Sequence, residues 1–378
     1  MEFVSSVFFN VVPFLVVLTL LVYVHEWGHY IVARKNGIRV EVFSIGFGPE
    51  IFGWTNKAGT RWKFSLIPLG GYVKIYDGLD EKGERPKDDK FPPDAALAKS
   101  PWQRIAVSIA GPAANYILAI VILAGLFMTV GQKVPQSGVE IGRVVATGAA
   151  ARAGLTSGDE ILSINGKTFK DLMELQGSIE DSPNKPITLK IRRQAEAEPI
   201  LLSVVPEPAT VNGREVGRLG VELTAKMVMV KRGYFEAFKF AAIETYSVSE
   251  RTVKSLGQMI TGKRSADGLS GPLGIASITG EVARQGIVNL FWLAAFLSIN
   301  LGLINLFPIP MLDGGHILFY FLEGIRGKPL NEKAQEMAFR FGFLFVAALF
   351  LFSTWNDISR LKIIETVTSL VKKAINLV

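Results

Sequence analysis

Residues 24–29 read Val-His-Glu-Trp-Gly-His and lie near the end of a long apolar run. His25 and His29 are four positions apart, so on a helix they share one face and can reach a single metal ion. Glu26 follows the first of them, where its carboxylate can act as a general base. The preceding run, Val7 to Val24, carries no charge and is close to the ~20 residues that span a bilayer. The stretch therefore points to peptide hydrolysis at a metal site within a membrane.

The composition is more apolar than that of an ordinary soluble enzyme. Of 378 residues, 49% are hydrophobic and only 20% are charged, and the apolar residues come in blocks. The absence of cysteine excludes disulfides, thiolate zinc ligands and cysteine nucleophiles. The net charge of +7 suits an anionic lipid surface, and no nucleic-acid-binding motif accompanies it. We therefore expect the lipid bilayer, and no nucleic acid, as a partner.

Four apolar stretches predict four membrane spans. They run from about Val7 to Ala33, Ile105 to Val130, Ile287 to Ile309 and Phe341 to Trp355, the last being short. Basic residues lie between the first two spans and again between the last two: Arg34, Lys35, Arg39, Lys99, Arg104, Arg326, Lys328, Lys333 and Arg340. Because basic loops stay on the cytoplasmic side, both loops are expected there, with the chain start and the segment between spans two and three outside.

The outside segment, about residues 133–225, is long enough for a small domain. Residues 161–164 are typical of a buried strand, Asn165-Gly166 of a tight turn, and residues 187–191 and 201–205 of further strands. The pattern Ala-Gly-Leu, Gly-Asp-Glu-Ile-Leu and Ile-Asn-Gly, which ends at Gly166, resembles the PDZ domains of bacterial proteases. That resemblance implies an α/β domain that binds a peptide or protein tail. The alternative is a small β domain with no peptide-binding role.

Two further segments complete the expected organisation. Between spans one and two, Trp62, Phe64 and Leu66 alternate with polar residues, which indicates a half-buried strand in a small membrane-associated β region. After the PDZ-like segment, residues 234–246 have the pattern of an amphipathic helix that lies on the membrane or on a neighbouring helix. We thus expect an α-helical membrane protein in four parts: a core over 1–132, the PDZ-like domain over 133–225, a helical linker over 226–286 and a second core over 287–378.

A third metal ligand is expected in the segment Asn305-Leu-Phe-Pro-Ile-Pro-Met-Leu-Asp313-Gly-Gly-His316. Its two prolines interrupt any helix, and unwound backbone at membrane depth is tolerated only inside protein or beside a wet cavity. Asp313 is therefore a candidate for the third ligand, and His316 is the competing candidate. The alternative for His316 is a local hydrogen bond, or a contact that supports a metal ligand without touching the metal. Asn305 is expected either to contact substrate backbone or to cap the broken helix.

Taken together, the motifs resemble a known family. His25-Glu-Trp-Gly-His29 and the Asn305–Asp313 segment are similar to the two signatures of the site-2 protease family of intramembrane zinc metalloproteases, and Gly111-Pro-Ala-Ala-Asn115 is similar to a third. Residues 43–49 and 68–74 resemble the β region of its RseP-like branch. The resemblance implies that Zn²⁺ is bound by His25, His29 and Asp313, and that Glu26 is the general base. It also implies a bacterial cytoplasmic (inner) membrane. Because His25 comes near the end of the first span, beside Arg34, Lys35 and Arg39, we expect the active site toward the cytoplasm. One departure is that the best-known bacterial member has two PDZ domains, whereas this chain shows one.

The expected function is cleavage of the transmembrane segments of single-span membrane proteins, such as anti-sigma factors or signal-peptide remnants. A transmembrane helix satisfies its own backbone, so a substrate must unwind before it is cleaved. The strand at residues 62–66 is expected to hold the unwound segment by strand addition. An inactive membrane scaffold with a PDZ domain is the alternative. An ion transporter is less favoured, since inverted repeats and several intramembrane carboxylates are not apparent.

Overall fold

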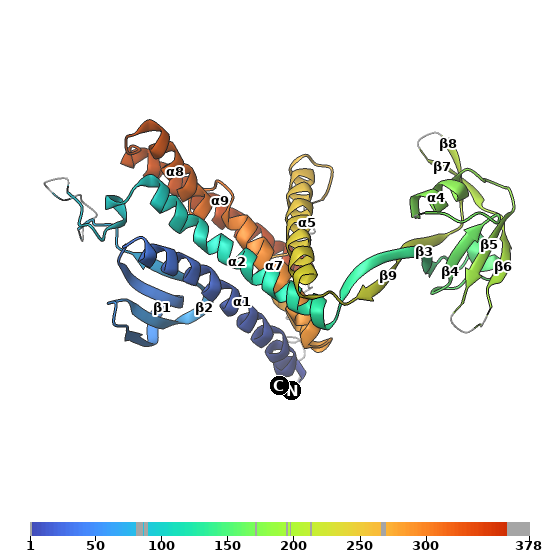
Figure 1. Ribbon diagram of the computed structural model, residues 1–378, viewed down its shortest axis with the longest axis horizontal. Coiled ribbons are helices and arrows are strands. Elements are labelled where there is room, and N and C mark those ends of the chain that lie inside the picture. The colour runs from blue at the N-terminus through green and yellow to red at the C-terminus, as the bar shows by residue number, and fades with distance from the viewer. Residues whose placement is uncertain are drawn as a thin grey trace, which may run out of the picture. The chain divides into compact units, whose positions relative to one another are not determined.

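The computed structural model describes residues 2–80, 86, 90–170, 172–193, 196, 198–211, 214–265 and 270–360. The chain divides into two compact units. Met1–Met128 and Gly233–Val378 form the first, which we call the membrane unit, and Thr129–Arg232 forms the second, the β domain. Figure 1 shows that long helices dominate the membrane unit, whereas the β domain is built on a sheet.

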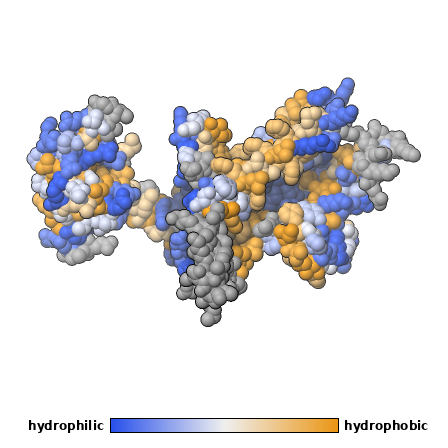
Figure 2. All heavy atoms as spheres, turned by 180° about the vertical axis from the view of Figure 1, so that it is seen from behind, coloured by the Kyte–Doolittle hydropathy of each residue, from blue (hydrophilic) through white to orange (hydrophobic). Residues whose placement is uncertain are grey.

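Four helices of the membrane unit are long and apolar enough to cross a bilayer, as predicted. They are α1 (Glu2–Lys35), α2 (Pro101–Thr129), α7 (Ile287–Asn305) and α9 (Glu332–Arg360). Many of their large apolar side chains are exposed, among them Val16, Ile117 and Leu344. Figure 2 shows such apolar side chains spread over the surface of this unit. An apolar outer surface of this kind is what contact with lipid requires.

Two predicted span boundaries were wrong. The last span was expected over Phe341–Trp355, but α9 runs from Glu332 to Arg360. Its first turns are charged, so the apolar run did not include them. They are still helical, and Arg340 pairs with Glu336 one turn away. The third span was expected to reach Ile309, but α7 ends at Asn305. Pro308 lacks an N–H and restricts the residue before it, so the helix cannot continue through that position.

Further helices connect the spans. The amphipathic segment forms α5 (Tyr234–Ile260), and α6 (Pro272–Arg284) follows it with proline in its first turn. The buried carboxylate of Asp357 in α9 accepts the backbone N–H groups of Gly271 and Gly274 at 3.0 and 2.8 Å. It thereby satisfies the N-terminus of α6 from another helix. The short helices η1 (Ala96–Ala98) and α8 (Asp313–Arg326) precede α2 and α9.

Between α1 and α2 the chain forms a curved sheet from β1 (Val40–Thr55) and β2 (Arg61–Ile75). Both strands are long and change register, so residues 40–45 pair with 71–75 on one side, and residues 42–45 pair with 61–64 on the other. Residues 61–65 pair in turn with 50–55. In the strand expected over 62–66, residues 62–64 are therefore flanked on both sides. The expected role of this strand in strand addition is wrong, because most of its backbone is already paired.

The β domain contains an antiparallel five-stranded sheet in the order β6-β5-β4-β3-β9. Its strands are β3 (Gln132–Val144), β4 (Glu160–Ile164), β5 (Ile187–Arg192), β6 (Ile200–Val204) and β9 (Val221–Val230). A hairpin of β7 (Glu207–Val211) and β8 (Arg214–Arg218) and the helices α3 (Ala149–Arg152) and α4 (Leu172–Glu180) complete it. The PDZ-like domain was expected to end at residue 225, but this residue lies inside β9, which pairs with β3 up to Val230. The compact unit extends to Arg232.

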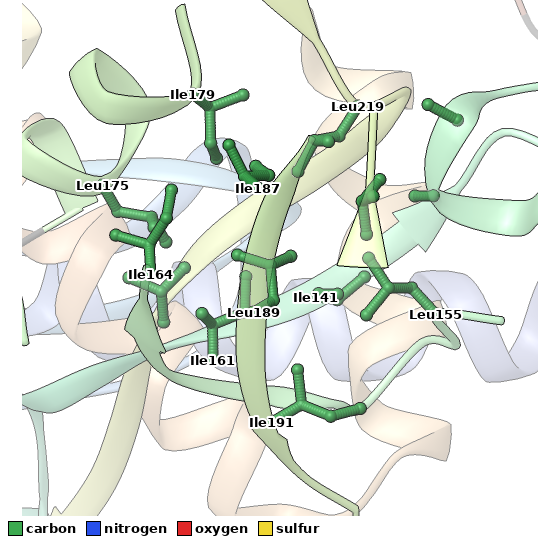
Figure 3. Packing of buried hydrophobic residues seen from close by; sticks show 14 residues of the cluster. Ile141, Leu155, Ile161, Ile164, Leu175, Ile179, Ile187, Leu189, Ile191 and Leu219 are labelled. Carbon is green, nitrogen blue, oxygen red and sulfur yellow. The ribbon is translucent and has the colours of Figure 1, made fainter. Parts of the chain in front are cut away.

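The β domain has its own hydrophobic core. Figure 3 shows side chains from the sheet meeting those of α4, among them Ile161, Leu175 and Leu189, all fully buried. β5 alternates buried and exposed residues along its length, the pattern of a strand with one face on a core. The predicted strands at 161–164, 187–191 and 201–205 are confirmed.

An ion pair between Arg193 and Asp159 stabilises this domain and lowers the pKa of the Asp159 carboxyl. Arg193 donates from Nε and Nη2 to the two carboxylate oxygens of Asp159, both at 2.8 Å, and the N–H of Thr156 donates to one of them. Asp159 is only 1% exposed. Burial favours its neutral form, but the hydrogen bonds from Arg193 and Thr156 outweigh burial and lower the pKa of the carboxyl.

Replacing Arg193 by Gln should lower the unfolding free energy of residues 129–232 by about 2 kcal/mol at neutral pH. A lowered pKa in the folded state gives stabilisation that is complete above the unfolded value of about 3.9 and is lost as pH falls through the folded value. Urea titrations should therefore show the difference shrinking in acid. Arg192→Gln, which changes an exposed partner of Glu160, should cost under about 1 kcal/mol. An R193Q difference that does not change with pH would contradict this account.

Candidate metal centre

Three side chains from two distant segments converge inside the membrane unit. His25 and His29 lie one turn apart on α1, and Asp313 is the first residue of α8. The two Nε2 atoms are 3.2 Å apart, His25 Nε2 is 3.1 Å from Asp313 Oδ2, and His29 Nε2 is 3.3 Å from Asp313 Oδ1. Among the described residues, the ligand atoms of these three side chains form a group that could hold a metal ion.

These three distances fit a zinc ion. Zinc binds imidazole nitrogen and carboxylate oxygen at about 2.0–2.1 Å in a tetrahedron, whose edge is then about 3.3 Å. The donor set of two neutral imidazoles and one carboxylate leaves the fourth corner open, as hydrolytic zinc sites require. The residues present therefore fit the ion, and they come from segments that the sequence predicted.

One face of α2 fixes the orientation of both imidazoles. His29 Nδ1 donates to the carbonyl oxygen of Val107 at 2.8 Å, and His25 Nδ1 lies 3.1 Å from the Asn115 amide nitrogen. Asn115 is fully buried, and its Oδ1 has no hydrogen-bond partner among the described residues. Gly111 lies between these contacts, where a Cβ atom would come within 2.8 Å of His25 Nε2 and closer still to His29. Only glycine lets α2 approach so closely.

Glu26 points into the same cavity as the three converging side chains. The cavity has a volume of about 720 Å³ and is lined by residues of α1, α2 and α8 and by residues 70–73 of β2. Val73 lines the cavity together with Glu26. A carboxylate held beside a metal site in this way can exchange a proton with a reacting group.

The interrupted chain between α7 and α8 brings Asp313 to the histidines. Met311 has a φ of 91°, and the prolines at 308 and 310 keep the segment out of a helix. A Cβ atom on Gly314 would overlap the carbonyl oxygens of Leu306 and Phe307, so the start of α8 packs directly on this segment. The broken backbone thus lines a cavity, as expected for irregular structure at membrane depth.

The structure separates the two candidates for third ligand. His316 lines the cavity, but its ring packs against those of Tyr320 and Phe339, at centroid distances of 6.0 and 5.2 Å. Asp313 instead reaches both histidines. Asn305 also lines the cavity, and its side chain forms no hydrogen bond within the described part of the chain, so it does not cap α7 there.

Sequence reasoning gave no role to several residues around the site. Asn115 is the one amide in the uncharged part of α2 from Ile105 to Thr129, and that polarity was the available signal. The Val107 carbonyl gives no signal in a sequence, because every residue has one. Residues 70–73 of β2 line the cavity, whereas reasoning from alternation had favoured the strand at 62–66.

Fold and site together define a multi-pass membrane metalloenzyme with a two-histidine, one-carboxylate centre. Residues 13–349 match peptidase family M50. The chain belongs to this family and is a zinc metalloprotease.

Proteins similar to this chain over most of its length support the assignment to this family. A protein of Rhizobium meliloti (strain 1021) is 40% identical over 365 residues, covering 93% of this chain and 96% of that protein. The regulator of sigma-W protease RasP of Bacillus subtilis (strain 168) is 33% identical over 426 aligned residues, covering 93% of this chain and 99% of its own length. Among solved structures, the PDZ domain of an SdrC-like protein from Listeria monocytogenes is 20% identical, covering 25% of this chain and 94% of that one, with a TM-score of 0.21.

Gly111→Ala should remove most of the bound zinc, because the added methyl group would occupy the space of both imidazoles. Gly125→Ala in the same helix is the matched control. A Cβ there meets no atom within 4 Å, and alanine favours helix by about 1 kcal/mol. Zinc content of the purified full-length proteins tests this, and a G111A protein that binds as much zinc as G125A would contradict the close-packing argument.

Proposed function

We propose that this protein is an intramembrane endopeptidase that cleaves transmembrane segments of single-span membrane proteins. The observation that carries the proposal is the meeting of His25, His29, Asp313 and Glu26 in one cavity bounded by membrane-spanning helices. His25, His29 and Asp313 hold the zinc ion, and Glu26 is the general base. The Bacillus subtilis relative is named as the regulator of sigma-W protease RasP, which favours anti-sigma factors as one substrate class.

When bound, a zinc ion supplies a Lewis acid that polarises the scissile carbonyl and activates water at neutral pH. Glu26 takes the proton of the attacking water and later gives it to the leaving amine. The surrounding cavity admits water to a site that lipid alone would keep dry.

Asn115 sets the tautomer of His25. To bind a metal at Nε2, His25 must carry its proton on Nδ1, which then needs an acceptor. A half-turn of the Asn115 amide places Oδ1, which has no partner among the described residues, opposite that proton. Val107 already accepts the corresponding proton of His29. One helix, α2, thereby prepares both imidazoles as ligands.

The substrate segment adds to the edge of the β1–β2 sheet at residues 70–75. This edge pairs with residues 40–45 on one side, and residues 70–73 line the cavity on the other. An unwound segment that pairs there satisfies its exposed backbone groups while it lies beside Glu26. Asn305, across the cavity, contacts the substrate backbone. Strand addition explains how a transmembrane segment that was helical is held in an extended form for cleavage.

We place the protein in the bacterial cytoplasmic membrane with the β domain outside. The basic residues that flank the first two spans favour this orientation. From Val7 to His25 a helix rises about 27 Å, most of a ~30 Å hydrocarbon core, so the site lies toward the cytoplasmic side. The PDZ-like β domain binds a peptide or protein tail and so limits which proteins reach the site.

Glu26→Gln should leave a folded, zinc-containing protein without protease activity, because only the proton acceptor is lost. The test is cleavage of a co-expressed single-span reporter together with zinc content. G125A serves as the active control. Cleavage by E26Q comparable to the control would remove the protease proposal and favour a membrane scaffold.

A cysteine at Lys57 should react with a membrane-impermeant thiol reagent only after cells are opened. One at Lys185, in the β domain, should react in cells with a permeable outer barrier. Both positions are exposed, and the natural chain contains no cysteine, so the labelling background is absent. Equal labelling of the two positions in sealed cells would show that the proposed orientation is wrong.

A further inference from the structure

A buried ion pair joins α2 to α8 beside the cavity. Arg104 Nη2 of α2 is 2.9 Å from Glu323 Oε2 of α8, and these side chains are only 11% and 8% exposed. The guanidinium also lies over the ring of Tyr320, 4.5 Å from its centroid. Glu323 accepts the N–H of Leu330 with its other oxygen, so both of its oxygens are occupied.

The same face of α8 carries the third converging side chain. Asp313, His316, Tyr320 and Glu323 are separated by three, seven and ten positions, which places them within an arc of about 80° on an α-helix. Arg104 and Tyr320 line the same cavity as Asp313. The rotation of α8 that brings Glu323 to Arg104 is therefore the rotation that turns Asp313 toward His25 and His29.

On α2, Arg104 belongs to the face that orients the imidazoles. Val107, Gly111 and Asn115 follow it at three, seven and eleven positions, which is one helical face. This face holds His29 through the Val107 carbonyl and His25 through Asn115. Arg104 adds contacts from this face to α8, and Trp102 beside it on α2 also packs on Phe321 of that helix. One helix thus positions all three ligand side chains.

Stability alone is a poor explanation for this pair. Desolvation of a buried ion pair offsets much of its attraction, and Arg104 Nε has no hydrogen-bond partner among the described residues. Apolar side chains would fill the same space at less cost. A planar guanidinium that stacks on Tyr320 and pairs with Glu323 instead fixes direction, which lysine would not reproduce.

We propose that Arg104 is a positioning residue for the zinc site. It sets the rotation and height of α8 through Glu323 and Tyr320, and so presents Asp313 to the metal held by His25 and His29. The inference rests on the proposed ligand set, and it assigns to α2 the control of the third ligand as well as the first two.

The test is the zinc dissociation constant of the full-length protein in detergent, measured by competition with a chromogenic chelator. R104Q and E323Q should each weaken zinc binding about 10–100-fold, as loss of supporting contacts does at zinc sites. The double variant should be no weaker than the worse single one, because the two residues act as one unit. The visible spectrum of the cobalt-substituted protein should change in R104Q, since the carboxylate ligand is displaced.

R193Q is the matched control, because it breaks a buried ion pair in the β domain. It should leave the zinc constant unchanged. A folded R104Q protein with the wild-type zinc constant and cobalt spectrum would overturn the proposal. Should R104Q not fold, R104K replaces it, and an unchanged constant in R104K would overturn it equally. Wild-type protein that binds no zinc would instead refute the proposed ligand set itself.

Discussion

The close approach of α1 and α2 is the constraint on which the rest of the site depends. A Cβ on Gly28 would overlap the carbonyl oxygen of Ala110, and one on Gly111 would overlap the imidazoles. Small residues let membrane helices pack at short distance where no hydrophobic force drives them together. At this distance Val107 and Asn115 can hydrogen-bond both histidines, so no ring nitrogen is left unpaired in an apolar environment.

The segment after α7 and the β1–β2 sheet also bring polar groups together within the membrane unit. The broken chain after α7 delivers Asp313 without an unsatisfied helix end in lipid, because the segment packs on itself and lines a cavity. The β1–β2 sheet presents residues 70–75 to the same cavity, where an unwound chain needs backbone partners. The proposed cleavage thus uses both a cavity that admits water and a strand edge at which a substrate can pair.

Apolar runs and one histidine motif were sufficient to predict four spans and the face of α1 on which His25 and His29 converge with Asp313. Local patterns could not reveal what depends on distant pairing. The strand at 62–66 alternates correctly, but register shifts that give it neighbours on both sides follow from the whole sheet. Arg104 counts in the sequence as one basic residue near a span, and only the fold brings it to Glu323. Asn115 could be marked as unusual in an apolar helix, but its partner came from the structure.

The central claim is that two imidazoles and one carboxylate, held by α2, bind a single zinc ion. Zinc K-edge X-ray absorption on the purified full-length protein tests it most directly. The account predicts one zinc per chain with four nitrogen or oxygen ligands at about 2.0–2.1 Å, two of them showing the outer-shell scattering of imidazole. A zinc ion with six oxygen ligands, or with fewer than two imidazoles, would contradict it.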